Sequence, residues 1–522
     1  MKDNSFIITL TGPSQSGKSL VMNKIIELGK ELCRQNICFT PKKIKKYTTR
    51  YLRLSEIELA DNGAEVDVEY AKNIPNTCDL VYQTYGVRYG IETAILLKEL
   101  KQGNSPIIVI NDIRVVEEIK KFFSGKVLSL FLFRKIPELD DFKKEAQNRG
   151  NVSELEVVAR YEKAVAIYRT YIENIVLFDK VILNSVEYMG GMEHARDTIL
   201  DRQLKNVLLP IIKGNKKLRA KMEFPQLSRI FVVAGNAASG KDEIIRALLS
   251  MGKLQAKVLP KYTMRQQEPE DGEEIICRYI PKKVCLKQMR DEYFEQRNNI
   301  CDNLNKMNKI FVSEYKKEFI YFRQQLEKNI KNEYERFWQA ISNEIVYGGK
   351  SRESILEQYF EINPDYKDLE KIKQQGKRVC EDQEVAIYEN SHHSYIIYGD
   401  EQKLYGCDIT EIQKILDENK YHLVIVASEI GVVNVLKEKF GEERVRLIYA
   451  HSEISMKEFE ANASDITKDE KKKRFQEILD NYTNEISNYD HVTIYAKSQL
   501  TYEQTSKEEE LIDQMFRLLR AY

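Results

Sequence analysis

A glycine-bounded loop between an apolar run and a helical pattern restricts the fold of this chain more than any other feature. Residues 6–11 form the apolar run, and residues 12–19 then read Gly-Pro-Ser-Gln-Ser-Gly-Lys-Ser. Apolar residues follow at helical spacing from Leu20 to Leu32. In a Gly-x4-Gly-Lys-Ser loop the backbone N–H groups surround phosphate oxygens, and the N-terminus of the next helix adds positive potential. The pattern therefore predicts an α/β fold built around a phosphate-binding loop.

Residue roles follow from the chemistry of such a loop. Lys18 is expected to reach the β- and γ-phosphates of ATP, and the Ser19 hydroxyl is expected to ligate Mg²⁺. ATP and Mg²⁺ are thus the predicted cofactors. The predicted ATP-binding residues of this loop are Gly12, Ser14, Ser16, Gly17, Lys18 and Ser19.

The same plan occurs a second time in the chain. An apolar run at 230–234 precedes Gly-Asn-Ala-Ala-Ser-Gly-Lys-Asp at residues 235–242. Further segments match in the same order: 46–50 with 261–265, 88–91 with 404–407, 107–110 with 423–426, 127–133 with 445–449, and 178–183 with 489–494. Repetition of this kind indicates a duplicated architecture. We expect two three-layer α/β domains with mainly parallel sheets.

The predicted boundaries place domain 1 at residues 1–200, a linker at 201–228 and domain 2 at 229–522. Domain 2 carries an extra segment at about 285–380 that is rich in Lys, Glu, Gln and Tyr, which indicates a helical insertion. This insertion is either a set of solvated helices with one buried stripe or a surface for a protein partner.

The second loop differs from the first at one chemically important position. Gly235, Gly240 and Lys241 are predicted to bind ATP, but Asp242 stands where the first loop has Ser19. An aspartate can ligate Mg²⁺, yet it also places a negative charge beside the triphosphate. Two interpretations remain: a working variant of the loop, or a degenerate nucleotide-binding or regulatory domain.

The composition argues against several other classes of protein. Lys and Arg number 81 and Asp and Glu also number 81, so the formal net charge of zero argues against a generally basic nucleic-acid binder. No apolar run approaches the roughly 20 residues that span a bilayer. The eight cysteines form no C-x-x-C pair, and no signal-peptide pattern is present, so we expect a reduced, cytoplasmic protein.

With the loop, Tyr-Thr-Thr-Arg at residues 47–50 and Tyr-Gly at residues 89–90 in this order, residues 5–190 resemble the guanylate kinase family. Weaker similarity covers about 229–500 outside the insertion. The resemblance implies a P-loop α/β core, a lobe that binds a nucleoside monophosphate, and a lid. It also implies transfer of the γ-phosphoryl group of ATP to a monophosphate.

The resemblance implies specific residues for the acceptor and for the lid. Arg50, Arg53 and Tyr89 match the residues that hold the acceptor phosphate, and Arg265 and Tyr405 match them in the second copy. Arginine suits this role because its planar donors bind phosphate in pairs. The predicted catalytic residues are Lys18 together with Asp112, Arg149 and Arg160, of which the two arginines belong to the lid-like segment.

Departures from the family pattern concern the acceptor. The glutamate that addresses guanine falls near Leu80 or Gln83, and Ile91 replaces a hydroxyl residue. Arg114 replaces a second carboxylate and joins the predicted substrate-binding residues. Tyr-Gly-Ile followed by Asn-x-x-Arg is similar to the ribose 1,5-bisphosphate phosphokinase branch.

The leading hypothesis is an ATP-dependent kinase that acts on a nucleoside monophosphate, GMP- or dGMP-like, or on a similar small phosphate-bearing acceptor such as a sugar phosphate. The alternatives are a ribose-bisphosphate-type sugar-phosphate kinase and a nucleotide-binding regulatory or scaffold protein with a pseudokinase second domain. Neither nucleic acid nor a membrane is an expected partner.

Overall fold

The computed structural model describes residues 5–13, 16–52, 57, 61, 66–84, 86–135, 139–147, 154–184, 193–218, 227–235, 239, 241, 244–245, 256–259, 261–263, 277–279, 385–389, 394–399, 404–452, 468–495 and 507–522. The chain forms two compact units. The first unit comprises residues 1–259 and 413–522, and the second comprises residues 260–412. Below, the N-terminal half means residues 5–218 and the C-terminal half means residues 227–522.

A five-stranded parallel sheet, here the first parallel sheet, forms the centre of the N-terminal half. Its order is β2-β7-β1-β8-β9. The strands are β1 (Ile7–Thr11), β2 (Thr40–Lys43), β7 (Asn104–Val109), β8 (Val127–Phe133) and β9 (Lys180–Leu183). All residues of β1 and β8 are buried, as continuous apolar runs covered on both faces should be.

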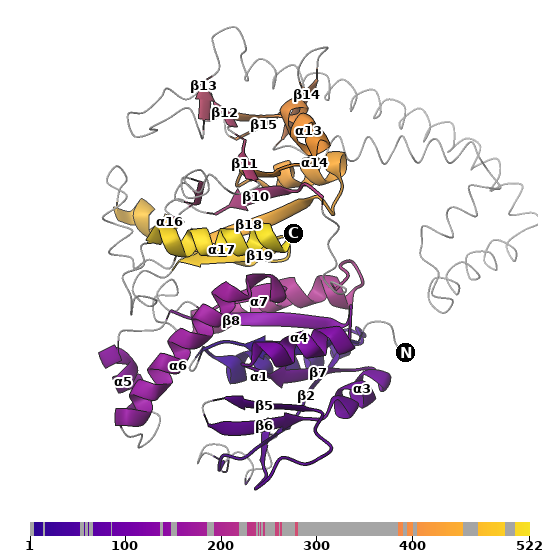
Figure 1. Ribbon diagram of the computed structural model, residues 1–522, viewed down its shortest axis with the longest axis vertical. Coiled ribbons are helices and arrows are strands. Elements are labelled where there is room, and N and C mark those ends of the chain that lie inside the picture. Colours follow the sequence, from indigo (N-terminus) through magenta and orange to yellow (C-terminus); the bar gives the residue numbers. More distant parts are fainter. Residues whose placement is uncertain are drawn as a thin grey trace, which may run out of the picture. The chain divides into compact units, whose positions relative to one another are not determined.

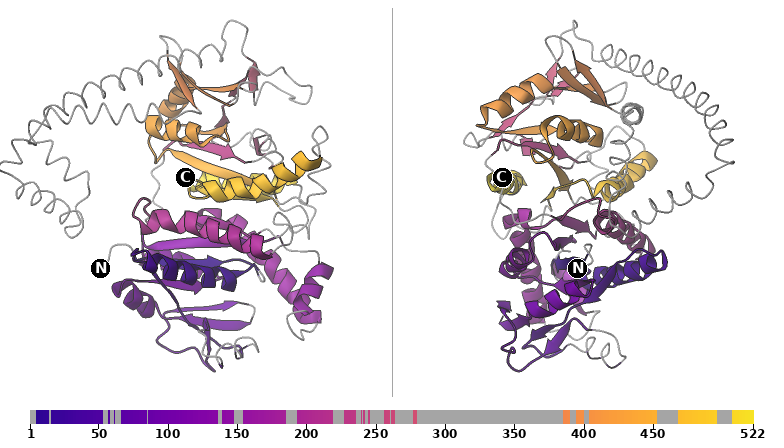
Figure 2. Two further views of the ribbon diagram at one scale, coloured as in Figure 1. Left: turned by 180° about the vertical axis from the view of Figure 1, so that it is seen from behind. Right: turned by 90° about the vertical axis from the view of Figure 1, so that its right-hand side faces the viewer.

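Helices cover both faces of this sheet. Figures 1 and 2 show α1 and α4 on opposite faces. The helices are α1 (Lys18–Arg34), α4 (Ile113–Phe122), α5 (Leu139–Gln147), α6 (Glu154–Glu173) and α7 (Glu193–Ile212). The short 3-10 helix η1 (Ile175–Leu177) joins α6 to β9.

A smaller four-stranded sheet, the first mixed sheet, lies in the same half with the order β4-β3-β6-β5. Its strands are β3 (Lys46–Thr48), β4 (Val68–Tyr70), β5 (Leu80–Thr84) and β6 (Val87–Ile91). Helix α3 (Thr93–Lys101) connects β6 to β7. Strands β5 and β6 form an antiparallel pair with Tyr82 opposite Tyr89.

The C-terminal half contains the second parallel sheet, whose order is β11-β17-β10-β18-β19. Its strands are β10 (Ile230–Ala234), β11 (Ala256–Val258), β17 (His422–Val426), β18 (Val445–Ser452) and β19 (His491–Tyr495). Its helices include α14 (Ile430–Phe440), α16 (Lys468–Glu485) and α17 (Lys507–Ala521). In both parallel sheets the strand before the phosphate loop is central and the last strand in sequence lies at an edge.

The second compact unit contains the second mixed sheet, ordered β13-β12-β16-β15-β14. Its strands are β12 (Lys261–Thr263), β13 (Cys277–Tyr279), β14 (Ala386–Glu389), β15 (Ser394–Gly399) and β16 (Leu404–Asp408). Helix α13 (Ile409–Glu418) follows β16. Strand β12 pairs with β13 in parallel and with β16 in antiparallel orientation, as β3 does with β4 and β6.

The predicted fold class, α/β with mainly parallel sheets, is confirmed. Strand β8 has the predicted bounds, and the other strands expected from apolar runs begin or end within a few residues of them. The predicted helical insertion at about 285–380 lies outside the described residues. Among the helices that the structure describes, none is long and apolar enough to cross a membrane.

Part of the linker predicted for residues 201–228 is helical in the structure. Helix α7 continues through this stretch to Ile212. The buried residues Leu204, Val207 and Leu208 recur at helical spacing, so burial of this face favours a packed helix over an open connection.

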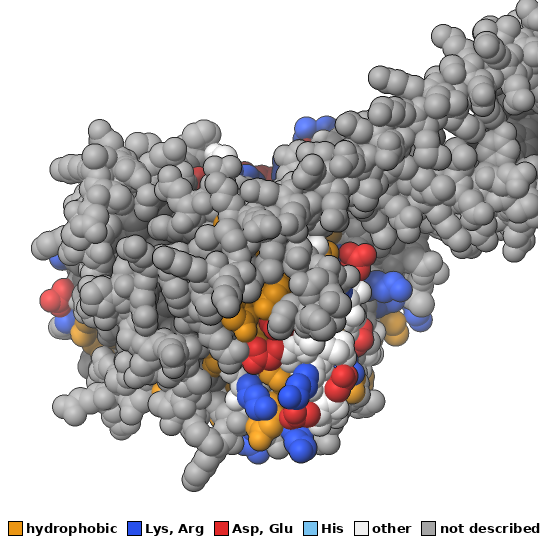
Figure 3. Space-filling view, turned by 90° about the horizontal axis from the view of Figure 1, so that it is seen from above, with side chains coloured by type: hydrophobic (Ala, Val, Ile, Leu, Met, Phe, Trp, Pro, Cys, Tyr) orange, Lys and Arg blue, Asp and Glu red, His pale blue; other side chains and the backbone are white. Residues whose placement is uncertain are grey.

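Positive and negative side chains of the described residues lie intermixed on the face shown in Figure 3.

Candidate functional site

The first phosphate loop lies between the carboxyl end of β1 and the first turn of α1. The Lys18 ammonium group donates to the carbonyl oxygens of Gly12 at 2.8 Å and Pro13 at 2.6 Å, so this cation lies over the loop. Ser19 is exposed in the first turn of α1, and Ser16 is buried. Ser14 lies outside the described residues.

Two glycines are required by the space around the loop. A Cβ atom on Gly12 would lie 2.6 Å from the Leu132 carbonyl oxygen, and one on Gly17 would lie 2.7 Å from Asn184 Nδ2. Gly17 also has φ of +90°, in the region that L-residues rarely adopt. The backbone can therefore follow this path only with glycine at both positions, which is the condition for close approach to a phosphate.

Asn184 holds the loop from the end of β9, two strands away from β1 in the sheet, and no sequence pattern predicted this role. It directly follows β9, and its Nδ2 donates to the carbonyl oxygen of Ser16 at 2.9 Å. Its backbone N–H donates to the Phe133 carbonyl oxygen at 2.8 Å, which fixes the residue beside the end of β8. The available signal was its position, because polar residues that directly follow parallel strands gather at one edge of the sheet.

Several buried polar atoms at this edge lack a hydrogen-bond partner among the described residues: Ser16 Oγ, Asn111 Oδ1 and Asn184 Oδ1. Buried polar atoms in folded proteins are nearly always paired, so a cluster of unpaired ones requires an explanation. A bound nucleotide with its metal and water ligands would supply such partners. The glycine cradle, the Lys18 ammonium group and the exposed Ser19 hydroxyl fit ATP and Mg²⁺ at this site.

Strand β7 connects this loop to the predicted acceptor residues. The Ile110 backbone N–H donates to the Leu10 carbonyl oxygen, and the Thr11 hydroxyl donates to the Ile110 carbonyl oxygen at 2.6 Å. One residue earlier, the Val109 carbonyl oxygen accepts from Lys46 Nζ of the first mixed sheet at 2.7 Å. The end of β7 thus contacts both the strand before the loop and the mixed sheet.

Lys46 is a second residue whose role no sequence pattern predicted. Its side chain is buried, and its Nζ lies 5.5 Å from the centre of the Tyr89 ring, at a distance typical of a cation–π contact. Tyr89 in turn stacks on Tyr82 with ring centres 5.3 Å apart. The signal for Lys46 was present in the repeat, since Lys261 occupies the matching position of the second segment.

Burial and nearby groups keep the Tyr82 hydroxyl protonated. Burial raises the pKa of Tyr82 far above its ordinary value, and the neighbouring Tyr89 and Asp112 raise this pKa further. The Tyr82 hydroxyl group can therefore serve as a neutral hydrogen-bond donor or acceptor at physiological pH.

Arg50 is positioned near Tyr89 by the pairing of β3 with β6. Thr48 pairs with Tyr89 in register, and the Arg50 backbone N–H donates to Thr48 Oγ1 at 3.3 Å. The Arg50 side chain donates to the carbonyl oxygen of Tyr51 at 3.1 Å. Arg53, which was predicted beside it, lies outside the described residues.

Two predicted site residues, Asp112 and Arg114, pair with each other. Asp112 caps the N-terminus of α4 by accepting from the Arg114 backbone N–H at 3.0 Å, and its carboxylate lies 3.1 Å from Arg114 Nη2. The Asp112 side chain is 10% exposed and the Arg114 side chain is 80% exposed. The hydrogen bond to Asp112 raises the pKa of the Arg114 guanidinium, which stays charged in any case.

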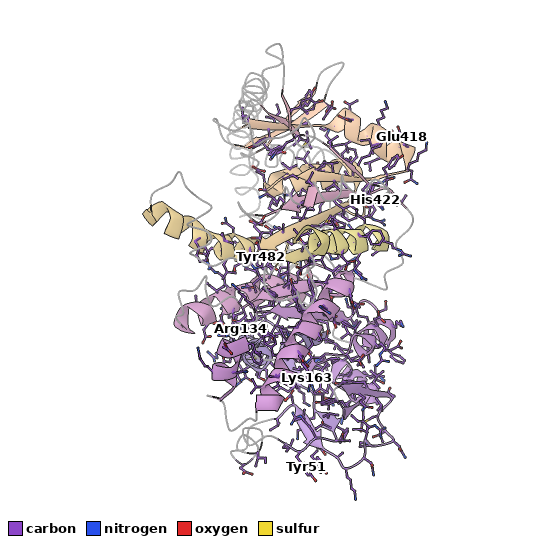
Figure 4. All side chains as sticks on the ribbon, turned by 60° about the vertical axis from the view of Figure 1, so that its left-hand side comes forward. Tyr51, Arg134, Lys163, Glu418, His422 and Tyr482 are labelled. Carbon is purple, nitrogen blue, oxygen red and sulfur yellow. The ribbon has the colours of Figure 1, made fainter. Side chains whose placement is uncertain are left out.

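The predicted lid is only partly described. Arg160 lies half-buried in α6, whereas Arg149 lies outside the described residues. Arg134 follows β8 at the carboxyl edge of the first parallel sheet and is labelled in Figure 4. Within the described residues, no group of three or more His, Cys, Asp and Glu side chains is arranged to hold a metal ion.

The second phosphate loop repeats the contacts of the first. Lys241 Nζ donates to the Gly235 carbonyl oxygen, as Lys18 does to Gly12. A Cβ atom on Gly235 would lie 2.7 Å from the Ala450 carbonyl oxygen and 2.6 Å from Ser239 Oγ. Gly240 lies outside the described residues.

The second compact unit repeats the tyrosine arrangement of the first mixed sheet. Lys261 Nζ lies 4.1 Å from the centre of the Tyr405 ring, and Tyr405 packs on Tyr398 with ring centres 5.8 Å apart. Arg265, the predicted partner of Tyr405, lies outside the described residues.

No protein-family model matches the chain. A guanylate kinase of Caldanaerobacter subterraneus subsp. tengcongensis is 27% identical to it over 165 residues, which are 31% of this chain and 74% of that protein. Among solved structures, a guanylate kinase from Anaplasma phagocytophilum matches with 18% identity and a TM-score of 0.24, covering 41% of this chain and 88% of that chain. Over the 165 residues of the sequence match, about the length of one domain, the chain is homologous to guanylate kinase.

Proposed function

We propose that the N-terminal half is an ATP- and Mg²⁺-dependent phosphotransferase. It transfers the γ-phosphoryl group to a nucleoside monophosphate or to a similar small phosphate-bearing acceptor. In this proposal Lys18 and Ser19 hold ATP and Mg²⁺, Arg50, Arg53 and Tyr89 hold the acceptor phosphate, and Arg149 and Arg160 stabilise the transferring group. Homology to guanylate kinase over one domain supports this reaction class at the level of the family.

One observation carries the proposal: β7 joins the two binding regions. Its end contacts the strand before the loop through Leu10 and Thr11, and it accepts the Lys46 ammonium group beside Tyr89. Phosphoryl transfer is mainly positioning and charge stabilisation, so a donor loop and an acceptor lobe fixed to one strand supply what the reaction needs.

A guanine nucleotide is less well supported as the acceptor than another phosphate-bearing molecule is. Leu80 and Ile91, which stand near the positions expected to address guanine, are both buried. The nearby Asp79 carboxylate is already engaged by the backbone N–H and hydroxyl of Thr93. The apolar side chains of Leu80 and Ile91 cannot hydrogen-bond a base edge, and base selection depends strongly on such bonds, so a sugar phosphate is the second candidate acceptor.

For the C-terminal half we propose a second guanylate-kinase-like domain, within residues 229–522, after domain 1 at 1–200. The equal strand order of the two parallel sheets and the matching contacts of Lys241 and Gly235 support this duplication. Asp242 leaves two roles open for this domain, a working variant site and a regulatory pseudokinase. We also propose, from the sequence alone, that the insertion at about 285–380 binds a protein partner.

An ADP-release screen against nucleoside and sugar monophosphates and sugar bisphosphates tests the reaction, with the phosphorylated product identified by mass spectrometry. Lys18→Ala should lower kcat/KM by about 10²-fold or more, because it removes a charge that stabilises the transferring phosphoryl group. Lys30→Ala, an exposed lysine on the same helix, is the matched control and should leave turnover unchanged. The ADP release that Lys241→Ala loses shows how much of the activity depends on the C-terminal half. Full activity of Lys18→Ala, or ATP hydrolysis without a phosphorylated acceptor, would contradict the proposal.

A further inference from the structure

The two parallel sheets meet through a reciprocal exchange of tyrosine hydroxyl groups. Tyr171 of α6 donates to the Val492 carbonyl oxygen of β19 at 2.6 Å. Tyr482 of α16 donates to the Val181 carbonyl oxygen of β9 at 2.7 Å. Tyr171 precedes Val181 by the same ten residues that separate Tyr482 from Val492, so the exchange relates equivalent positions of the two halves. All four residues belong to the first compact unit, and Tyr482 is labelled in Figure 4.

This exchange satisfies backbone groups at the edges of both sheets. Strands β9 and β19 are edge strands, and an edge leaves a row of peptide groups without a neighbouring strand. Both tyrosine side chains are almost completely buried, at 1% exposure each. A hydroxyl group lost here would leave a carbonyl oxygen of the other half buried without this donor.

The two edge strands lead to different residues. Three positions after Val181, β9 leads to Asn184, whose Nδ2 donates to the Ser16 carbonyl oxygen of the first phosphate loop. Three positions after Val492, the chain has Tyr495 instead. The exchange between Tyr171 and Tyr482 is therefore symmetric, although Tyr168 of α6 adds a bond to the Ile494 carbonyl oxygen at 3.0 Å that Leu479, at the matching position of α16, cannot make. Within the described residues, an asparagine links strand to loop only at β9, the strand that Tyr482 contacts.

We infer that Tyr482, from the C-terminal half, is a positioning residue for the phosphate loop of the N-terminal half. By holding β9 at Val181, it fixes Asn184 under Ser16 and thereby sets the affinity of the first loop for a nucleoside triphosphate. The C-terminal half then regulates the first site through packing, whether or not it catalyses a reaction. This inference rests on the proposed function of the loop as a nucleotide site.

The symmetry of the exchange supplies a matched pair of variants. Tyr482→Phe and Tyr171→Phe each remove one buried hydroxyl group and keep the ring, so both should lower the thermal midpoint by similar amounts. Only Tyr482→Phe should affect the first loop. These variants are compared in a chain that also carries Lys241→Ala, so that the ATP binding measured is that of the first loop. In this background, calorimetry should show that Tyr482→Phe lowers the affinity for ATP–Mg²⁺ about threefold to tenfold. It should stay within twofold of the parent for Tyr171→Phe.

Hydrogen exchange provides a readout that needs no nucleotide. In the nucleotide-free full chain, amides of residues 12–19 should exchange faster in Tyr482→Phe than in Tyr171→Phe. Asn184→Ser should reproduce the faster exchange, and adding Tyr482→Phe to it should cause little further change, because both act through one connection.

Equal effects of the two tyrosine variants on the loop would overturn the inference, as would full additivity of Tyr482→Phe with Asn184→Ser. If the Lys241→Ala chain bound no ATP, the proposed function would fail instead. The exchange comparison would then still decide whether Tyr482 positions the loop.

Discussion

Gln203 and Leu183 exchange two hydrogen bonds at the edge of the first parallel sheet. Gln203 Nε2 donates to the Leu183 carbonyl oxygen at 3.0 Å, and the Leu183 backbone N–H donates to Gln203 Oε1 at 3.0 Å. In the C-terminal half, Gln514 makes the same two bonds with Ile494, at 2.7 and 2.9 Å. A side-chain amide thus replaces a neighbouring strand at equivalent positions of both sheets, because it offers one donor and one acceptor.

Replacing this amide by a carboxylate should destabilise the fold. Gln203→Glu loses the donor to Leu183 and places a charge at a fully buried position, so we expect a loss of about 1–3 kcal/mol in the free energy of unfolding. Gln514→Glu should act similarly. Urea denaturation at pH 7 measures both, and the exposed Gln35→Glu is the control. A wild-type midpoint for Gln203→Glu would show that the paired bonds contribute nothing.

Gly17 provides a test of the shape of the phosphate loop. Gly17→Ala should weaken ATP binding at the first loop at least about tenfold, since the new Cβ would lie 2.7 Å from Asn184 Nδ2 in a backbone conformation disfavoured for alanine. Gly214→Ala has a similar φ of +76° with no atom within 4 Å of its Cβ. This control should cost about 1 kcal/mol of stability and leave ATP affinity unchanged. Calorimetric titration with ATP–Mg²⁺ compares the two variants. Equal ATP affinities of Gly17→Ala and Gly214→Ala would contradict the predicted clash.

Lys46 should affect the acceptor more than ATP. Lys46→Met removes the donor to the Val109 carbonyl oxygen and the cation beside Tyr89, so KM for the acceptor should rise about tenfold, with a smaller change in KM for ATP. The exposed neighbour Lys45→Met is the matched control. Steady-state kinetics with each substrate varied in turn provide the measurement, and a rise confined to KM for ATP would argue against this role.

His422 should make the second parallel sheet sensitive to acid. The Arg229 backbone N–H donates to His422 Nδ1 at 3.2 Å, and burial together with the Arg229 charge lowers the His422 pKa to about 4. Because the folded-state pKa is below the ordinary value of 6.5, the unfolded chain binds more protons between these values. Stability from the neutral ring is complete above about pH 6.5 and is lost as the pH falls toward 4.

His422→Asn keeps a side-chain acceptor without a titrating ring. Urea denaturation between pH 7 and pH 5 should therefore show a flatter stability profile for this variant, by on the order of 1–2 kcal/mol over that interval. Parallel profiles of the two proteins would show that His422 does not titrate as described. His422 is labelled in Figure 4.

Local patterns predicted the strands formed by apolar runs and the glycine-bounded loop, but not the extent of helix α7. The apolar run at 127–133 predicted β8 with its bounds, and the glycine spacing predicted the turn before Lys18. Sequence patterns did not predict contacts between residues that are far apart in the chain. Asn184 is separated from Ser16 by 168 residues, and no local pattern relates an asparagine to that carbonyl oxygen.

The sequence by itself determined the strands formed by apolar runs, the position of two glycine-bounded loops and the order in which similar segments recur, because backbone preference and apolar periodicity act over a few residues. Only the tertiary structure decided which donors meet which acceptors: Asn184 with Ser16, Lys46 with Val109, and the two tyrosines with strands of the opposite half. A hydrogen bond requires two atoms within about 3 Å in a suitable direction, and that condition is fixed by the packing of sheets rather than by residue type.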